Sequence, residues 1–153
     1  MLLLQNKCNP NLCRHDLMDI RLSPLCVSAT YEMTTIMKLL LKYGADPNFK
    51  IQDQDFELPL FIASENGNVQ LVTLLLENSA NPNLCSTSPG SPGWSPLYVA
   101  CEKGHVEIVQ DLLKHKADQN IYTKERKLPL HIAKSKGHKH IVCLLQQSKI
   151  KKH

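Results

Sequence analysis

The chain contains few aromatic side chains and no long apolar run. Phe, Trp and Tyr make up 5% of its 153 residues. No apolar stretch approaches the roughly 18 residues that a membrane-spanning helix needs. The opening Met1-Leu2-Leu3-Leu4 is too short for a signal peptide, and polar residues follow it at once. These absences predict no membrane association and a cytoplasmic or nuclear location.

The sequence also lacks the spacings that hold metals, disulfides or reacting groups. Its six cysteines include no CxxC pair, and no matched histidine pair accompanies them. No G-x-S-x-G, H-E-x-x-H or phosphate-loop motif is present. We therefore expect free thiols, no metal, no cofactor and no enzymatic activity.

What the chain does contain is an internal repeat. A proline–leucine pair recurs at intervals of 35, 37 and 33 residues, at Pro24, Pro59, Pro96 and Pro129. An asparagine stands 24 positions after each of the first three prolines. Apolar pairs recur 12 and 13 positions after every proline, at Ile36-Met37, Leu71-Val72, Ile108-Val109 and Ile141-Val142. A fixed period of this length is typical of solenoid proteins.

A partial copy of the repeat precedes the complete ones. Residues 4–13 parallel residues 76–85 almost letter for letter, so we expect the chain to begin inside a repeat, either as an excised segment or as a short N-terminal cap. We divide residues 1–148 into one repeat domain, followed by a basic tail. Its parts are a partial repeat at 1–13, repeats at about 14–48, 49–83, 84–120 and 121–148, and the tail at 149–153.

Each repeat specifies a pair of helices. Proline suits a first helical turn, where its missing N–H would have no partner anyway. Ser23 and Ser95 stand just before that proline and can cap the helix. Gly67, Gly104 and Gly137 lie eight residues after the proline, where a left-handed residue can end the first helix. The second helix carries a wide apolar stripe that only a neighbouring repeat can cover.

These features resemble the ankyrin repeat, whose pattern runs T-P-L-H-x-A, then G-H, then V-V-x-x-L-L-L and G-A-D-x-N. Residues 95–100 read S-P-L-Y-V-A, residues 104–109 read G-H-V-E-I-V, and residues 39–48 read L-L-L-K-Y-G-A-D-P-N. The resemblance implies an all-α solenoid of stacked antiparallel helix pairs with projecting β-hairpin-like loops. It also implies a concave face that binds other proteins.

The sequence departs from that pattern in two ways. No repeat keeps both the threonine and the histidine of T-P-L-H, so we expect the hydrogen-bond network that they form in the family to be weak or rebuilt. Leu58 and Leu128 replace the capping hydroxyl, at an expected cost of about 1 kcal/mol each. Glu32 and Met33 stand where later repeats have Gly and then His or Asn, so the turn between the helices of the first repeat is expected to follow the family least.

The resemblance places the loop residues before each proline, and the last turn of each first helix, on the concave face. Trp94 follows the Pro/Gly/Ser-rich stretch 86–93, which we interpret as a spacer. Its ring is either an exposed binding anchor or folded back onto its own or the neighbouring loop. The predicted partner-binding residues are Tyr31, Asp53, Asp55, Glu57, Glu65, Trp94, Glu102, Lys103 and Lys127.

Charge is distributed unevenly along the chain. Residues 1–121 hold 9 Lys/Arg and 13 Asp/Glu, a net charge of −4, whereas residues 124–153 hold 9 against 1, a net charge of +8. This polarity would orient a peptide of opposite polarity and speed its encounter with the chain. Alternatively, the cations only solvate an exposed terminal repeat.

The sequence therefore predicts a monomeric, non-catalytic module that binds a partner protein through its concave face. One alternative is a spacer or scaffold segment of a larger multidomain protein. Another is contact between the basic fourth repeat and nucleic acid. The second is disfavoured because no aromatic residue interleaves with the basic tail and no groove-reading motif is present.

Overall fold

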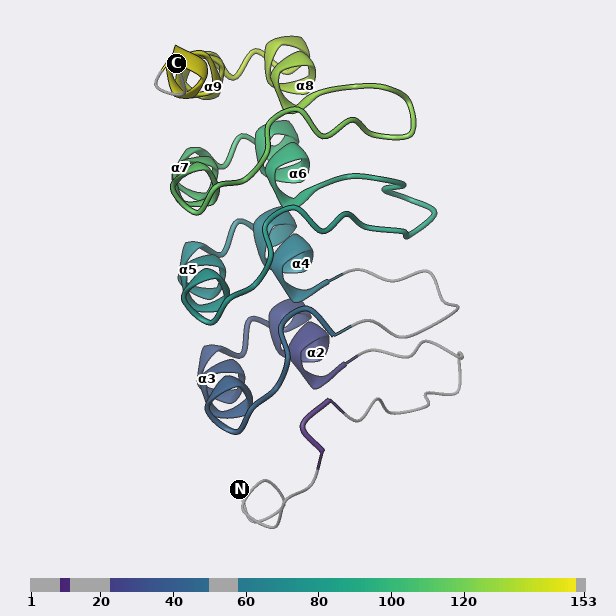
Figure 1. Cartoon of the computed structure of the whole chain (residues 1–153), viewed down its shortest axis with the longest axis vertical. Coiled ribbons are helices and arrows are strands. Elements are labelled where there is room, and N and C mark those ends of the chain that lie inside the picture. The colour runs from purple at the N-terminus through teal and green to yellow at the C-terminus, as the bar shows by residue number, and fades with distance from the viewer. Residues whose placement is uncertain (1–8, 12–22, 50–57, 151–153) are drawn as a thin grey trace.

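The computed structural model describes residues 9–11, 23–49 and 58–150, and this part of the chain contains eight helices. They form four consecutive pairs stacked in one column, which confirms the predicted all-α solenoid (Figure 1). The pairs are α2 (Pro24–Thr30) with α3 (Thr34–Lys42), α4 (Pro59–Asn66) with α5 (Val69–Glu77), α6 (Pro96–Lys103) with α7 (Val106–Lys114), and α8 (Pro129–Ser135) with α9 (Lys139–Ile150).

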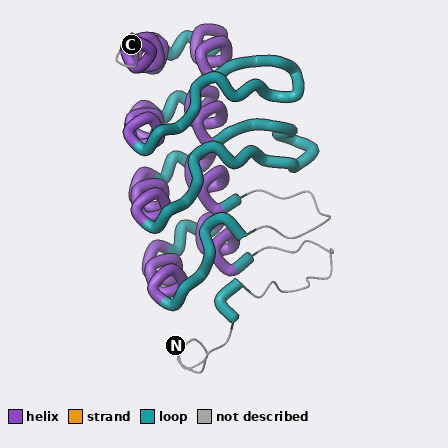
Figure 2. The backbone as a smooth tube through the Cα atoms, in the orientation of Figure 1, coloured by secondary structure: helices purple, strands orange, loops and turns teal. Residues whose placement is uncertain are grey.

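The helices lie in two layers. The first helices α2, α4, α6 and α8 form one layer, the second helices α3, α5, α7 and α9 form the other, and long loops project from the side of the first helices (Figure 2). Within each layer every helix packs against the corresponding helix of the next repeat. Within the described ranges, no helix has the length and apolar character needed to cross a membrane.

The core runs along the column between the two layers. The residues 12 and 16 positions after the proline are fully buried in the second, third and fourth pairs. Ile36 holds the first of these positions in α3 and is 47% exposed, because among the described residues no second helix precedes α3. The buried set is Leu71, Leu75, Ile108, Leu112, Ile141 and Leu145.

The caps of the first helices follow the sequence prediction. Ser23 Oγ accepts a hydrogen bond from the Cys26 N–H at 3.2 Å, and Ser95 Oγ accepts one from the Tyr98 N–H at 3.1 Å. Leu58 provides no side-chain cap, but its side chain is only 3% exposed, so its burial offsets part of the expected cost. At Leu128 the backbone N–H donates to His131 Nδ1 at 3.3 Å.

Asparagine side chains in the turns that follow the second helices form hydrogen bonds between successive repeats. The Oδ1 atoms of Asn48 and Asn83 accept the N–H groups of Asn81 and Asp118, each at 2.7 Å. Asn11 Oδ1 accepts the Asp46 N–H in the same way at 2.9 Å. Because each bond crosses from one repeat to the next, these side chains fix the register of stacking.

A second set of bonds between repeats uses the histidine that follows the glycine. His105 Nε2 lies 3.2 Å from the Glu65 carbonyl oxygen, and His138 Nε2 lies 3.1 Å from that of Glu102. Each ring also rests on the glycine of the preceding repeat, Gly67 or Gly104. Hydrogen bonding between repeats therefore exists here even though no repeat retains both the threonine and the histidine of T-P-L-H.

The turn between α2 and α3 keeps the hydrogen bonding of the other repeats, although it lacks their glycine. Glu32 adopts φ 55°, where Gly67 and Gly104 have φ 77° and 84°. The Met33 N–H donates to the Ser28 carbonyl at 2.8 Å, as the His105 N–H does to Ala100 at 3.0 Å. The turn is thus preserved. Glu32, however, carries a Cβ, which disfavours the left-handed conformation that the turn requires.

Replacing Glu32 with glycine is expected to raise the free energy of unfolding by about 0.5–1 kcal/mol, because relief of the left-handed strain exceeds the extra entropy of glycine in the unfolded chain. Urea denaturation followed by circular dichroism measures the change. Glu32→Ala serves as the control, since it removes the same charge and keeps the Cβ. Equal stability of the two variants would show that φ is not the cause.

Candidate functional site

The loop before α6 is held together by its own hydrogen bonds. The Ser86 N–H donates to the Trp94 carbonyl, and the Gly93 N–H donates to the Ser86 carbonyl, both at 2.9 Å. The hydroxyls of Ser86 and Ser91 are 2.8 Å apart, and both residues are buried. These bonds hold the two arms of the loop together and fix where Trp94 emerges. No regular strand is assigned in the described residues.

The next loop packs against this one. The Lys124 N–H donates to the Pro92 carbonyl at 3.3 Å. Within the second loop, the Thr123 N–H donates to the Lys127 carbonyl at 3.0 Å and the Arg126 N–H donates to the Thr123 carbonyl at 2.8 Å. The two loops, residues 84–95 and 121–128, therefore support each other at the edge of the first-helix layer.

Trp94 lies half-buried at the base of the first loop. Its ring packs against Tyr98 of α6 with a centroid distance of 4.8 Å and an interplanar angle of 57°. Burial raises the pKa of Tyr98, and the nearby Lys127 ammonium opposes that shift. The indole is thus supported by its own repeat and still partly open to solvent. Trp94, Tyr98 and Lys127 together form what we call the aromatic corner.

The last turns of α4, α6 and α8 carry a chain of opposite charges. Lys103 Nζ lies 4.0 Å from a Glu65 carboxylate oxygen and 3.9 Å from one of Glu102. Lys136 Nζ lies 3.5 Å from the other Glu102 oxygen. Lys136 is not among the predicted binding residues. The sequence could have identified it, because it occupies the same repeat position as Lys103. Glu65, Lys103, Glu102 and Lys136 form the charge ladder.

The structure brings some of the predicted partner-binding residues together. Glu65, Glu102 and Lys103 meet in the charge ladder, and Trp94 and Lys127 both lie near Tyr98 in the aromatic corner. Tyr31 directly follows α2 and is 68% exposed; it occupies the repeat position of Lys103 and Lys136, one repeat before Glu65. The remaining predicted residues, Asp53, Asp55 and Glu57, fall outside the described residues.

Exposed ion pairs at this face add little stability. The Lys127 ammonium lies 2.6 Å from a Glu125 carboxylate oxygen, with both side chains more than half exposed. Lys103 and Glu65 are also well exposed, at 44% and 38%. Such pairs typically contribute about 0–1 kcal/mol. Their importance is therefore the charge pattern that they present rather than the stability of the fold.

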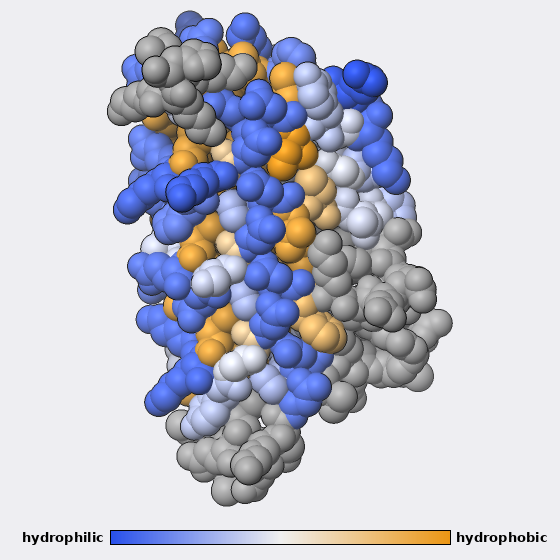
Figure 3. Space-filling model, viewed as in Figure 1, coloured by the Kyte–Doolittle hydropathy of each residue, from blue (hydrophilic) through white to orange (hydrophobic). Residues whose placement is uncertain are grey.

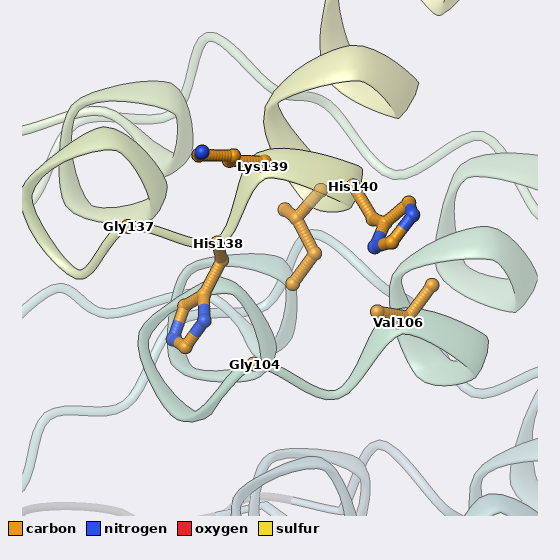
Figure 4. Close-up of a pocket in the computed structure, with 7 residues that line it drawn as sticks. Gly104, Val106, Gly137, His138, Lys139 and His140 are labelled. Atoms are coloured by element: carbon orange, nitrogen blue, oxygen red, sulfur yellow. The ribbon is translucent and has the colours of Figure 1, made fainter.

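A hollow of about 340 Å³ lies on another surface, beside the turns that join α6 to α7 and α8 to α9. In Figure 4 the His138 ring turns toward Gly104, while His140 lies beside Val106. The other lining residues are Gly137, Lys139 and Ile141, so no carboxylate or thiol faces the hollow. Elsewhere too, the part of the chain that the structure describes holds no group of three side chains able to bind a metal ion.

The cysteine thiols of the described repeats differ in exposure. Cys143 is exposed on α9, as its repeat position predicts. Cys101 is fully buried in α6, and burial raises the pKa of its thiol from 9.0 to about 12. A thiol with this pKa stays protonated at neutral pH and is a poor nucleophile.

Comparisons with known proteins identify a repeat family along the chain. A family model described as ankyrin repeats (3 copies) matches residues 1–86 and again residues 60–153. The chain is also similar to histone-lysine N-methyltransferase EHMT1 of Homo sapiens, with 42% identity over 48 residues. That match covers 31% of this chain and 4% of the human protein, so the chain spans only a small part of that relative.

Proposed function

This chain belongs to the ankyrin repeat family, and from that premise we propose that it is a non-catalytic module that binds a partner protein through its first-helix face. That face comprises α2, α4, α6 and α8 with the loops that precede them. Its most prominent features are the aromatic corner, at the start of α6, and the charge ladder, which joins the ends of α4, α6 and α8.

The observation that carries the proposal is the support of Trp94 by Tyr98. A tryptophan held at 4.8 Å from a buried tyrosine loses little side-chain freedom when a partner covers its open side. Large, rigid aromatic side chains of this kind are enriched among the residues that dominate binding energy. The corner is therefore the natural anchor point of the face.

The charge ladder suits the polar rim of such an interface. Lys103 lies between two carboxylates, at 4.0 and 3.9 Å, so both signs of charge stand side by side on this face. A mixed charge pattern penalises partners of the wrong charge pattern more than it strengthens the right one. The ladder is thus expected to select the partner, whereas the corner supplies most of the affinity.

The double variant Trp94→Ala/Lys103→Glu is expected to weaken binding by about thirtyfold or more, which corresponds to the loss of one hot spot of about 2 kcal/mol. The partner is first captured from a cell lysate on the immobilised chain and identified by mass spectrometry. Calorimetric titration of the purified partner then compares the affinities of the original chain and the variant.

Lys114→Glu is the matched control, because it reverses the same charge at an exposed position of α7, in the other helix layer. It should leave the affinity unchanged, and circular dichroism should show equal helix content in all three proteins. Equal loss of affinity in both variants, or none in either, contradicts the use of the first-helix face. Failure to retain any protein specifically would favour a spacer role.

A further inference from the structure

The exposed end of the fourth repeat differs from the other repeats at three positions. The positions 2 and 5 residues after the proline are buried in the first three repeats. The position 10 residues after the proline is half-buried in those repeats. In the fourth repeat these three positions hold the exposed side chains of His131, Lys134 and Lys139. We call this surface the terminal face. It lies at the top of Figure 1, over α8 and the start of α9.

The position 5 residues after the proline shows the change most clearly. Ala29, Ser64 and Cys101 occupy it in the other repeats, and all three are fully buried against neighbouring helices. Lys134 replaces them with a long cation, so a further repeat could not stack on α8 without burying that charge. The terminal face is therefore unsuited to the apolar contact that joins the other repeats.

A terminal repeat needs a polar outer surface, but that need does not dictate the sign of the charge. All three replacements are basic, and Lys124, Arg126 and Lys136 are exposed in the same repeat. Residues 124–153 contain one carboxylate side chain, that of Glu125, and it already pairs with Lys127 at 2.6 Å. The fourth repeat thus has no acidic side chain of its own left to neutralise this surface.

Two aliphatic side chains accompany these cations. Val142 and Leu130 are half-buried, whereas the residues at their positions in the first three repeats are buried. His131 Nδ1 accepts the Leu128 N–H, which leaves Nε2–H to donate outward. The surface therefore offers hydrogen-bond donors and cations around a small apolar patch.

From these observations we infer that the terminal face is a second docking surface, and that it binds an acidic protein segment. Carboxylates of the segment would pair with Lys134 and Lys139 and accept from His131, while an aliphatic side chain would cover Val142. The aromatic corner and the charge ladder are not part of this surface, so the inference can be tested separately from the binding proposed for those two features. The half-buried Val142 and Leu130 beside the cations favour a peptide, which carries aliphatic side chains, over a phosphate backbone.

The probe is a short fluorescein-labelled polyglutamate peptide, titrated with the full chain and followed by fluorescence anisotropy. Binding is expected at about 50 mM salt and should weaken at about 300 mM, where screening is stronger. The variant Lys134→Ala/Lys139→Ala should weaken binding by roughly 25-fold, since each lost contact between opposite charges costs about fivefold in water. Both lysines are exposed, so the fold should persist.

The control variant Lys38→Ala/Lys42→Ala removes the same charge from exposed positions of α3, in the first repeat. It should bind the peptide as the original chain does, and Trp94→Ala should do the same. Equal weakening in both lysine variants, or no binding at low salt, would overturn the inference. Tighter binding of a single-stranded oligonucleotide of matched charge, lost in the Lys134/Lys139 variant, would also overturn it and assign the surface to nucleic acid.

Discussion

Replacing Leu75 with alanine is expected to lower the free energy of unfolding by about 3–4 kcal/mol, a large part of the stability of a domain of this size. Leu75 lies in α5 and is fully buried. α5 packs against α3 on one side and α7 on the other, so the stack cannot easily collapse around the cavity. Urea denaturation followed by circular dichroism measures the loss.

Leu145→Ala provides the matched comparison. Leu145 occupies the same repeat position in α9 and is equally buried, but α9 has a neighbouring second helix on one side only among the described residues. Its truncation is expected to cost about 2–3 kcal/mol, because α9 can shift toward α7 and reduce the cavity. If the terminal substitution proves more costly than the central one, packing on both sides is not what makes Leu75 important.

The burial of these leucines could be predicted from the sequence because the repeat period sets the direction in which each side chain faces. Any residue 12 or 16 places after the proline faces a neighbouring helix when a repeat stands on that side. Ile36 shows the limit of this reasoning, since it holds a core position by period and is 47% exposed. Period predicts which direction a side chain faces, whereas burial also depends on what is packed there.

The candidate site was less accessible to sequence reasoning. The residue types around Trp94 indicate a loop. The backbone hydrogen bonds of Ser86 with Gly93 and Trp94, which fix the position of the indole, depend on the conformation of the whole loop. The charge ladder joins three repeats, and its members stand 37 and 34 residues apart in the chain, from Glu65 to Glu102 and from Glu102 to Lys136. The repeat register brings these positions together, yet it does not show which charges pair.

The second large effect is expected at the glycine that ends α4. Gly67→Ala should lower the free energy of unfolding by about 2–3 kcal/mol, the sum of left-handed strain and one displaced hydrogen bond. The backbone at Gly67 has φ 77°, and a Cβ there would lie 2.6 Å from His105 Cε1. The ring would have to move, although its Nε2 is bonded to the Glu65 carbonyl at 3.2 Å. Thermal or urea unfolding measures the loss.

Gly137→Ala separates the two causes. Gly137 has the same φ of 77° at the same repeat position, but a Cβ there would meet nothing within 4 Å. Its substitution should therefore cost only the strain, about 1 kcal/mol after the lower entropy of alanine in the unfolded chain is counted. The difference between the two variants then measures how strongly His105 holds the second and third repeats together. Equal losses would mean that the histidine contributes nothing to stacking, and that the glycine is required by the backbone alone.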